Sequence, residues 1–300
     1  MKFEITILGC GSAIPTLLRN PTSQVVNVME RYMMIDCAEG TQVQLRKYKV
    51  AFQKIDHIFI SHLHGDHYLG LVGLISSVHL FGRNKTLHIY GPKELEQIIF
   101  SQLKASKSSL CYLIEFHPLV SDSSELIYED SIVEVYTIPL KHRIYCNGFL
   151  FKEKPKERRL SKELIEKYNI PVEMMPKLKR GEAWGSYSNA ELTLPANRSR
   201  SYAYCSDTAY SESIIPIIQN VDVLYHESTF LEDMSKRAKS TFHSTAKQAA
   251  SIAQLSNSKL LLLGHYSARY KSNKEFENEA KEIHDNVKAV EDGDTISIPL

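Results

Sequence analysis

The chain carries a dense run of metal-binding residue types at Ser61-His62-Leu63-His64-Gly65-Asp66-His67. Three imidazoles and one carboxylate lie within six residues, directly after the apolar run 57–60, which predicts a buried strand. Gly65 can adopt the turn at which a strand end delivers several side chains to one point. Neutral imidazole and carboxylate suit zinc, and this spacing lets one loop serve two ions. A hydrogen-bonded surface cluster of histidines is the alternative, and it explains the crowding less well.

Further blocks along the chain accompany this motif. They are Ile7–Ser12, Arg19–Asn20, Asp36–Gln42, Tyr90–Pro92, Ser206–Thr208, His226–Phe230, His243–Thr245 and Gly264–Tyr270. In order and wording, these blocks and the His-x-His-x-Asp-His motif resemble the ribonuclease Z family of the metallo-β-lactamase superfamily. The resemblance covers nearly the whole chain. It implies a zinc-dependent endoribonuclease that cleaves precursor tRNA at its 3′ side and leaves a 3′-hydroxyl on the tRNA and a 5′-phosphate on the trailer.

Composition sets weaker bounds on function. The 300 residues can form one domain, which we expect to span 1–300, and the formal net charge is only +1. Any nucleic-acid surface must therefore come from local clustering of charge. The five cysteines are scattered without a CxxC pair, which argues against a disulfide framework and fits a cytoplasmic protein. No signal peptide or membrane-spanning run is present, so we expect no membrane contact.

Apolar periodicity predicts strands that alternate with helices. The expected strands are 3–8, 24–29, 32–35, 57–60, 87–90, 132–138, 201–205, 221–225 and 259–263. The expected helices are 68–80, 92–106, 161–168, 209–218, 245–254 and 274–284. This order predicts an α/β domain in which helices flank stacked sheets. The family resemblance implies, more specifically, a four-layer αββα metallo-β-lactamase-like sandwich.

The segment 151–185 differs from the rest in charge and looks like an insertion. From Lys152 to Arg180 there are ten lysines and arginines against five glutamates. A solvated loop is one interpretation. The resemblance implies a tRNA-binding arm, or exosite, at this place in the order. We therefore favour phosphate contact here, and expect RNA binding by Lys177, Lys179 and Arg180.

The resemblance also implies a ligand set for two Zn²⁺ per subunit. His62, His64 and His142 would hold one ion, Asp66, His67 and His265 the other, and Asp207 would bridge both. Two such ions would activate a water molecule and stabilise charge on the attacked phosphate.

Other residues receive roles outside the ligand set. Asp66 would also accept the proton of the attacking water, while His243, held by Glu227, would donate a proton to the leaving 3′ oxygen. Support of the metal ligands is the alternative role for His243 and Glu227. Arg19 and Asn20 resemble the segment that meets the 3′ end of tRNA, although an ordinary surface turn is equally compatible with them. The remaining histidines match no ligand block, and we interpret them as structural: His57, His79, His88, His117 and His284. We interpret His226 as structural or as a support of the metal ligands.

Two other functions stay open at this level. The metal motif specifies hydrolysis better than it specifies substrate, so another metal-dependent phosphodiesterase or 3′ nuclease is the main alternative. An RNA-binding module with a structural metal site is a second, but closed structural zinc sites are usually rich in cysteine. The partners expected are precursor tRNA and a second copy of the chain in a homodimer, the latter implied by the resemblance alone.

Overall fold

The computed structural model describes residues 2–300, and its framework is a pair of mixed sheets with seven strands each. The first sheet has the order β14-β1-β2-β3-β4-β5-β6. Its strands are β1 (Phe3–Gly9), β2 (Ser23–Val28), β3 (Arg31–Ile35), β4 (Ile55–Phe59), β5 (Leu87–Pro92), β6 (Ile114–Leu119) and β14 (Thr295–Ser297). The second sheet has the order β13-β12-β11-β10-β9-β8-β7. Its strands are β7 (Leu126–Glu129), β8 (Val133–Pro139), β9 (Asn147–Glu153), β10 (Ser201–Cys205), β11 (Val223–Glu227), β12 (Leu260–Gly264) and β13 (Val287–Ala289).

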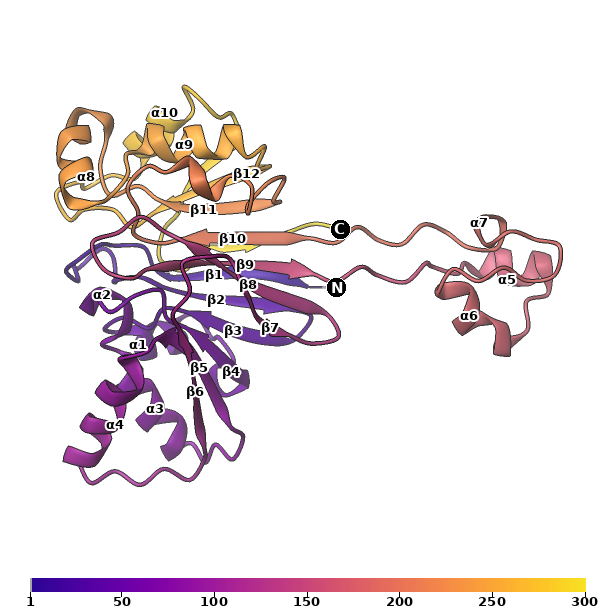
Figure 1. Ribbon diagram of the computed structural model, residues 1–300, viewed down its shortest axis with the longest axis horizontal. Helices are drawn as coiled ribbons and strands as arrows, with labels where there is room; N and C mark the ends of the chain where they lie inside the picture. The colour runs from indigo at the N-terminus through magenta and orange to yellow at the C-terminus, as the bar shows by residue number, and fades with distance from the viewer. Residues whose placement is uncertain (1) are drawn as a thin grey trace.

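Helices cover the outer faces of the two sheets (Figure 1). The α-helices are α1 (Thr41–Lys47), α2 (Gly65–Tyr68), α3 (Leu71–Leu80), α4 (Leu95–Ala105), α5 (Lys162–Tyr168), α6 (Met175–Lys179), α7 (Asn189–Leu192), α8 (Ser235–Thr241), α9 (Ala246–Leu255) and α10 (Lys274–Ala280). Short 3₁₀ helices are η1 (Phe52–Lys54), η2 (Val172–Met174), η3 (Glu212–Ile214) and η4 (Glu232–Met234). Within residues 2–300, no helix is long and apolar enough to cross a membrane.

Alternation of side chains along the strands explains the layers. In β4, Phe59 joins the core between the sheets, where it packs near Phe149 and Phe151 of the second sheet. Its neighbour Ile58 points to the opposite face, into the apolar cluster formed with α3 and α4. Full burial of each such side chain stabilises the fold by about 1.5–3 kcal/mol. The arrangement confirms the expected αββα sandwich.

Most of the expected elements are present, with ends shifted by a few residues. Thr245 starts α9 as expected, because its hydroxyl accepts a hydrogen bond from the backbone N–H of Gln248 in a capping box. The expected helix 209–218 is wrong, since only the three-residue η3 forms there. Pro216 lacks the N–H that a continuing helix needs, which accounts for the difference.

The segment between β9 and β10 leaves the sandwich as a long projection, with α5, α6 and α7 at its far end (Figure 1). We call residues 154–200 the arm. Its tip has a small apolar core of its own, built on Ile170, Leu178 and Leu192. The arm begins later than the expected 151–185, because residues 151–153 still pair within β9. It also ends later, because the chain must return from the tip to β10 along a second extended connection, or stalk.

Strand direction brings chemistry-bearing loops to one edge of the sandwich. In the first sheet β3, β4, β5 and β6 are parallel, and in the second β10, β11, β12 and β13 are parallel. The carboxyl ends of parallel strands meet at the same edge of a sheet. The His-x-His-x-Asp-His motif follows β4, and Asp207, Glu227 and His265 lie at or just after the ends of β10, β11 and β12.

Candidate metal centre

The first group of possible ligands gathers around one oxygen of Asp207. Its ligand atoms all lie within 4.8 Å of one another, and its members are His62, His64, His142 and Asp207. His64 Nδ1 is 3.0 Å from His62 Nε2 and 3.2 Å from His142 Nε2. Asp207 Oδ2 is 3.6 Å from His62 Nε2 and 3.9 Å from His142 Nε2. Three imidazoles and one carboxylate oxygen thus surround a single point.

The second group gathers around the other oxygen of the same carboxylate. Asp66, His67 and His265 form this group. Asp207 Oδ1 is 3.3 Å from His67 Nε2 and 3.1 Å from His265 Nε2. Asp66 Oδ2 lies 3.6 Å and 3.5 Å from the same two nitrogen atoms. Asp207 therefore faces one group with each oxygen, as a bridging carboxylate would.

The atoms themselves fit metal ions. Nε2 of His67 and Nε2 of His265 are buried and have no hydrogen-bond partner within residues 2–300, although burial of an unpaired polar atom is costly. Tetrahedral ligands at zinc bond lengths of about 2.0–2.1 Å lie about 3.3 Å from one another. Distances of 3.1 to 3.6 Å between the ligand atoms of the second group match that spacing. The seven expected ligands therefore form two groups that suit two divalent cations.

The electrostatics of the centre favour positive charge. Burial disfavours the imidazolium of His67, yet the carboxylates of Asp207, Asp66 and Asp36 hold its pKa well above the ordinary value. Burial would likewise raise the pKa of Asp207, but the imidazoles of His265, His67 and His62 hold it well below the usual range. A cation at this place would supply the charge that these carboxylates attract.

A second layer of hydrogen bonds orients the imidazoles. Asp36 Oδ2 lies 2.8 Å from Nδ1 of His67, and the hydroxyl of Thr229 lies 2.9 Å from Nδ1 of His265. Nδ1 of His142 contacts the backbone oxygen of Phe242 at 3.0 Å. Such partners hold each imidazole so that its other nitrogen faces the centre. Asp36 lies in the Asp36–Gln42 block, but no local pattern indicates its contact with His67, which is 31 residues away in the chain.

The partly exposed His243 and the buried Glu227 form a pair beside the ligand groups. Nδ1 of His243 is 2.8 Å from Glu227 Oε1, and Glu227 also accepts hydrogen bonds from the backbone N–H groups of Thr208 and Thr229. Burial lowers the basicity of His243, but Glu227 and nearby carboxylates outweigh it and raise the pKa of His243 to about 9. The pair can therefore present a protonated imidazole to the adjoining cavity.

That cavity, of about 630 Å³, opens over the ligand groups. It is lined by Asp66, Asp207, His243 and His265 together with three exposed arginines, Arg143, Arg237 and Arg269. The amino-acid sequence did not single out these three arginines, although Arg269 lies in the Gly264–Tyr270 block. Guanidinium groups at the rim can bind phosphate by paired hydrogen bonds.

Two of the expected RNA contacts, Arg19 and Asn20, have partners within the protein. Arg19 is buried, donates a hydrogen bond to the backbone oxygen of Tyr270 at 2.9 Å, and lies over the ring of Tyr266. The amide of Asn20 donates to Asp292 at 2.9 Å. Neither residue lines the cavity. Their loop does reach the centre through Ala13, whose backbone N–H donates to Asp66 at 2.7 Å.

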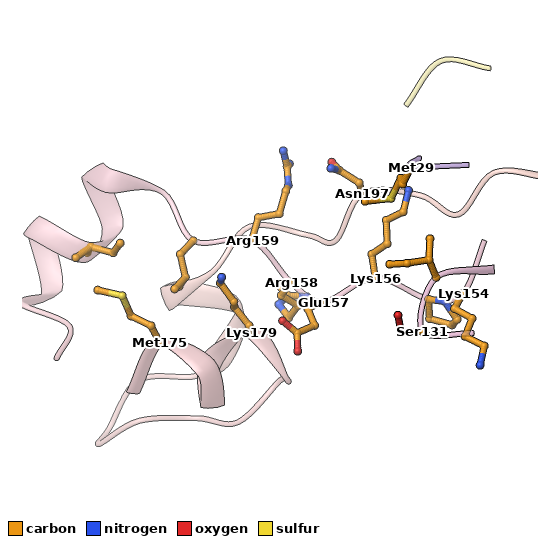
Figure 2. A pocket seen from close by; sticks show the side chains of 14 residues that line it. Met29, Ser131, Lys154, Lys156, Glu157, Arg158, Arg159, Met175, Lys179 and Asn197 are labelled. Carbon is orange, nitrogen blue, oxygen red and sulfur yellow. The ribbon is translucent and has the colours of Figure 1, made fainter. Parts of the chain in front are cut away.

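The other expected RNA contacts, Lys177, Lys179 and Arg180, lie exposed on the arm, in or directly after α6. Helix α6 lies at the far end of the arm (Figure 1), and none of the three residues belongs to the ligand groups or lines the cavity over them. The arm meets the body around a second hollow of about 750 Å³, lined by Lys154, Lys156, Arg158, Arg159 and Lys179 among others (Figure 2).

The fold and the clustered imidazoles and carboxylates define a metal-dependent hydrolase of the metallo-β-lactamase type. The chain belongs to the ribonuclease Z family: it is 48% identical to Ribonuclease Z of Parabacteroides distasonis over 301 residues, covering 99% of both chains. It is 47% identical to Ribonuclease Z of Porphyromonas gingivalis strain W83, covering 94% of both chains. Membership makes it a ribonuclease.

Other comparisons agree with the fold. The short form of human tRNase Z superposes with a TM-score of 0.74 and 27% identity, over 99% of this chain and all of that one. The metallo-β-lactamase fold protein YhfI of Bacillus subtilis gives a TM-score of 0.71 at 19% identity and 99% coverage of this chain. Residues 3–154 also match the family described as anti-Pycsar protein Apyc1. That match includes the first metal motif but ends before Asp207, Glu227 and His265.

Proposed function

We propose that the chain is a zinc-dependent endoribonuclease that cleaves precursor tRNA at its 3′ side, leaving a 3′-hydroxyl on the tRNA and a 5′-phosphate on the trailer. The observation that carries this proposal is the placement of the two Asp207 oxygens, each facing a separate group of imidazoles under one cavity. The ribonuclease Z relatives and the human tRNase Z structure support tRNA as the substrate.

The residues that would hold the metal follow from the two groups. His62, His64 and His142 would bind one ion, Asp66, His67 and His265 the other, and Asp207 both. The chemistry that two such ions supply is the activation of water near neutral pH and the neutralisation of charge on phosphate. All seven candidate ligand side chains offer nitrogen or oxygen donors, and none offers a thiolate. This donor set suits an open catalytic site better than a closed structural one.

Proton transfer would be shared between two parts of the cavity. Asp66 would accept the proton of the attacking water, because its carboxylate faces His67 and His265 and is held in place by the N–H of Ala13. His243 would donate a proton to the leaving 3′ oxygen, since Glu227 keeps its imidazole charged near neutral pH. An acid and a base on different walls suit in-line displacement at phosphorus.

Basic side chains would bind the phosphate backbone of the substrate at two distances from the scissile bond. Arg143, Arg237 and Arg269 line the cavity and would contact phosphates next to the scissile bond. Farther away, Lys177, Lys179 and Arg180 on the arm tip would contact the body of the tRNA. The basic stalk residues Lys156, Arg158 and Arg159, labelled in Figure 2, extend this positive surface toward the sandwich.

The direction of the arm supports a homodimer. The arm leaves β9 at Glu153 and returns to β10 at Ser201, whereas Asp207 follows the opposite end of β10. Five strand residues span about 16 Å, so the arm and the cavity belong to opposite edges of the same sheet. An RNA gripped by the arm would more easily enter the cavity of a second subunit. The five free cysteines fit a reducing cytoplasm as the place of action.

The decisive experiment incubates purified protein with a precursor tRNA that carries a 3′ trailer, with and without a chelator, and maps the cut at nucleotide resolution. A chelator-sensitive cut after the discriminator base is the expected result. Hydrolysis of a small phosphodiester without any tRNA cleavage would overturn the proposal in favour of another metal-dependent phosphodiesterase.

A further inference from the structure

A separate group of ligand-type side chains lies on the first sheet, and it shares no residue with the centre described above. Its members are His88 on β5 and Glu115 and His117 on β6. His88 pairs directly with Glu115 across the parallel strands, and Glu115 and His117 are two residues apart. Because side chains alternate along a strand, all three lie on one face. They are partly open to solvent, with 28% of the His88 side chain and 32% of the His117 side chain exposed.

One ligand atom from each of the three side chains lies within 4.8 Å of the other two. Nδ1 of His88 is 3.1 Å from Nε2 of His117 and 3.5 Å from Glu115 Oε2, and Glu115 Oε1 is 3.9 Å from Nε2 of His117. Three tetrahedral ligands of one zinc ion would lie about 3.3 Å from one another. Small rotations of the exposed glutamate are enough to bring the oxygen to that distance.

Neighbouring rings hold both imidazoles in plane. His57 stacks on His88 with 5.0 Å between ring centroids and 12° between planes, and Tyr90 stacks on His117 at 4.3 Å and 11°. Nδ1 of His57 is itself buried without a hydrogen-bond partner among the described residues. A ligand set that is already oriented loses little entropy when an ion binds.

We propose that His88, Glu115 and His117 form a second metal site, which takes one divalent transition ion of the zinc type and leaves at least one coordination position to water. Two imidazoles and one carboxylate select against Mg²⁺ and Ca²⁺, which prefer oxygen ligands throughout. The alternative is a purely structural role for His88 and His117, as the sequence alone indicates.

The test counts zinc bound to the purified, metal-loaded protein by equilibrium dialysis against Zn²⁺. Glu115→Gln and His117→Gln should each bind one ion fewer than the unmodified chain, while His284→Gln, a partly buried histidine outside all groups of ligand-type residues, should bind the full number. Ribonuclease activity should stay unchanged in all three variants. Because the difference between variants is read, the result does not depend on how many ions the catalytic centre holds.

Equal zinc numbers in all four proteins would overturn the proposal. Glu115 is 59% exposed, so its replacement by glutamine leaves the core intact and keeps the test valid even if His117→Gln folds poorly. A loss of bound zinc in His284→Gln as large as in the other two variants would also overturn it, because the effect would then not be specific to the site.

Discussion

The Asp36 carboxylate lies 2.8 Å from Nδ1 of His67, at the end of a buried chain of hydrogen bonds under the metal centre. Asp36 is fully buried and also accepts hydrogen bonds from Ser61 and Tyr204. Its backbone has a φ of +54°, in the left-handed region that residues other than glycine seldom adopt. A strained, buried carboxylate beside the imidazole of an expected metal ligand is typical of a residue that positions such a ligand.

Asp36→Asn should weaken zinc binding by about 10- to 100-fold, since an amide orients the His67 imidazole less firmly and does not compensate its charge. Competition with a chromogenic chelator measures the zinc affinity. Asp130→Asn is the matched control, because Asp130 pairs with Arg31 away from the cavity. Equal zinc affinity in both variants would contradict the positioning role.

Asp207→Ala should lose bound metal and both activities, on tRNA and on a small phosphodiester, because both ligand groups lose an oxygen and its negative charge. Metal analysis of the purified variant and the two activity assays give the answer. Full activity with an unchanged metal content would refute the bridging role of Asp207.

His243→Ala should slow tRNA cleavage by about 100- to 10,000-fold while metal content is retained. A diester with a nitrophenolate leaving group should be cleaved nearly as fast as before, since that leaving group needs no proton. The comparison of kcat on the two substrates therefore separates proton donation from support of the ligands. An equal loss on both substrates would favour the supporting role.

Replacing Lys177, Lys179 and Arg180 together by alanine should weaken tRNA binding roughly tenfold or more and flatten its dependence on salt by about two units of the log–log slope. Hydrolysis of a small diester should be unaffected, because Lys177, Lys179 and Arg180 do not line the cavity over the candidate ligands. Alanine at the exposed Lys47, Lys49 and Lys104 removes the same charge from the body as a control. Unchanged tRNA affinity in the arm variant would remove the arm from the proposal.

Glu153→Gln should lower the free energy of unfolding by about 3–5 kcal/mol, because a neutral amide replaces the buried carboxylate that pairs with the guanidinium of Arg200 at the base of the arm. Glu129→Gln, which breaks an exposed pair with Lys154, should cost less than about 1 kcal/mol. Urea unfolding measures both.

The same ion pair gives a pH dependence. Burial raises the pKa of Glu153, but Arg200 and Lys156 outweigh burial and hold it below the ordinary value. A lowered folded-state pKa means that the carboxylate stabilises the fold fully above the unfolded pKa of about 4.3. This contribution should disappear as the pH falls below that value toward the folded-state pKa. Glu153→Gln should therefore lose less stability than the unmodified chain between pH 5 and about 3, in urea titrations at each pH.

Local sequence was enough to predict an α/β domain of stacked sheets and to bring four of the seven expected ligands together, whereas the αββα sandwich followed from the family resemblance. The alternation of apolar and polar side chains predicts the strands. His62, His64, Asp66 and His67 lie together because they share one short loop after β4. Asp207 and His265 followed from the family's motifs. The helix expected at 209–218 does not form, because Pro216 cannot donate a backbone hydrogen bond there, although the apolar residues have helical spacing.

Tertiary structure decided what depends on distant pairing. Asp36 reaches His67, and three arginines reach one cavity, only through the order and register of the strands. His88 meets Glu115 and His117 because β5 and β6 pair in parallel in one particular register. The sequence by itself thus determined the layers, the metal motif and the basic segment, since these rest on local periodicity and spacing. Orientation of the ligands, the lining of the cavity and the direction of the arm came from the packed fold, because contacts across strands leave no local pattern in the chain.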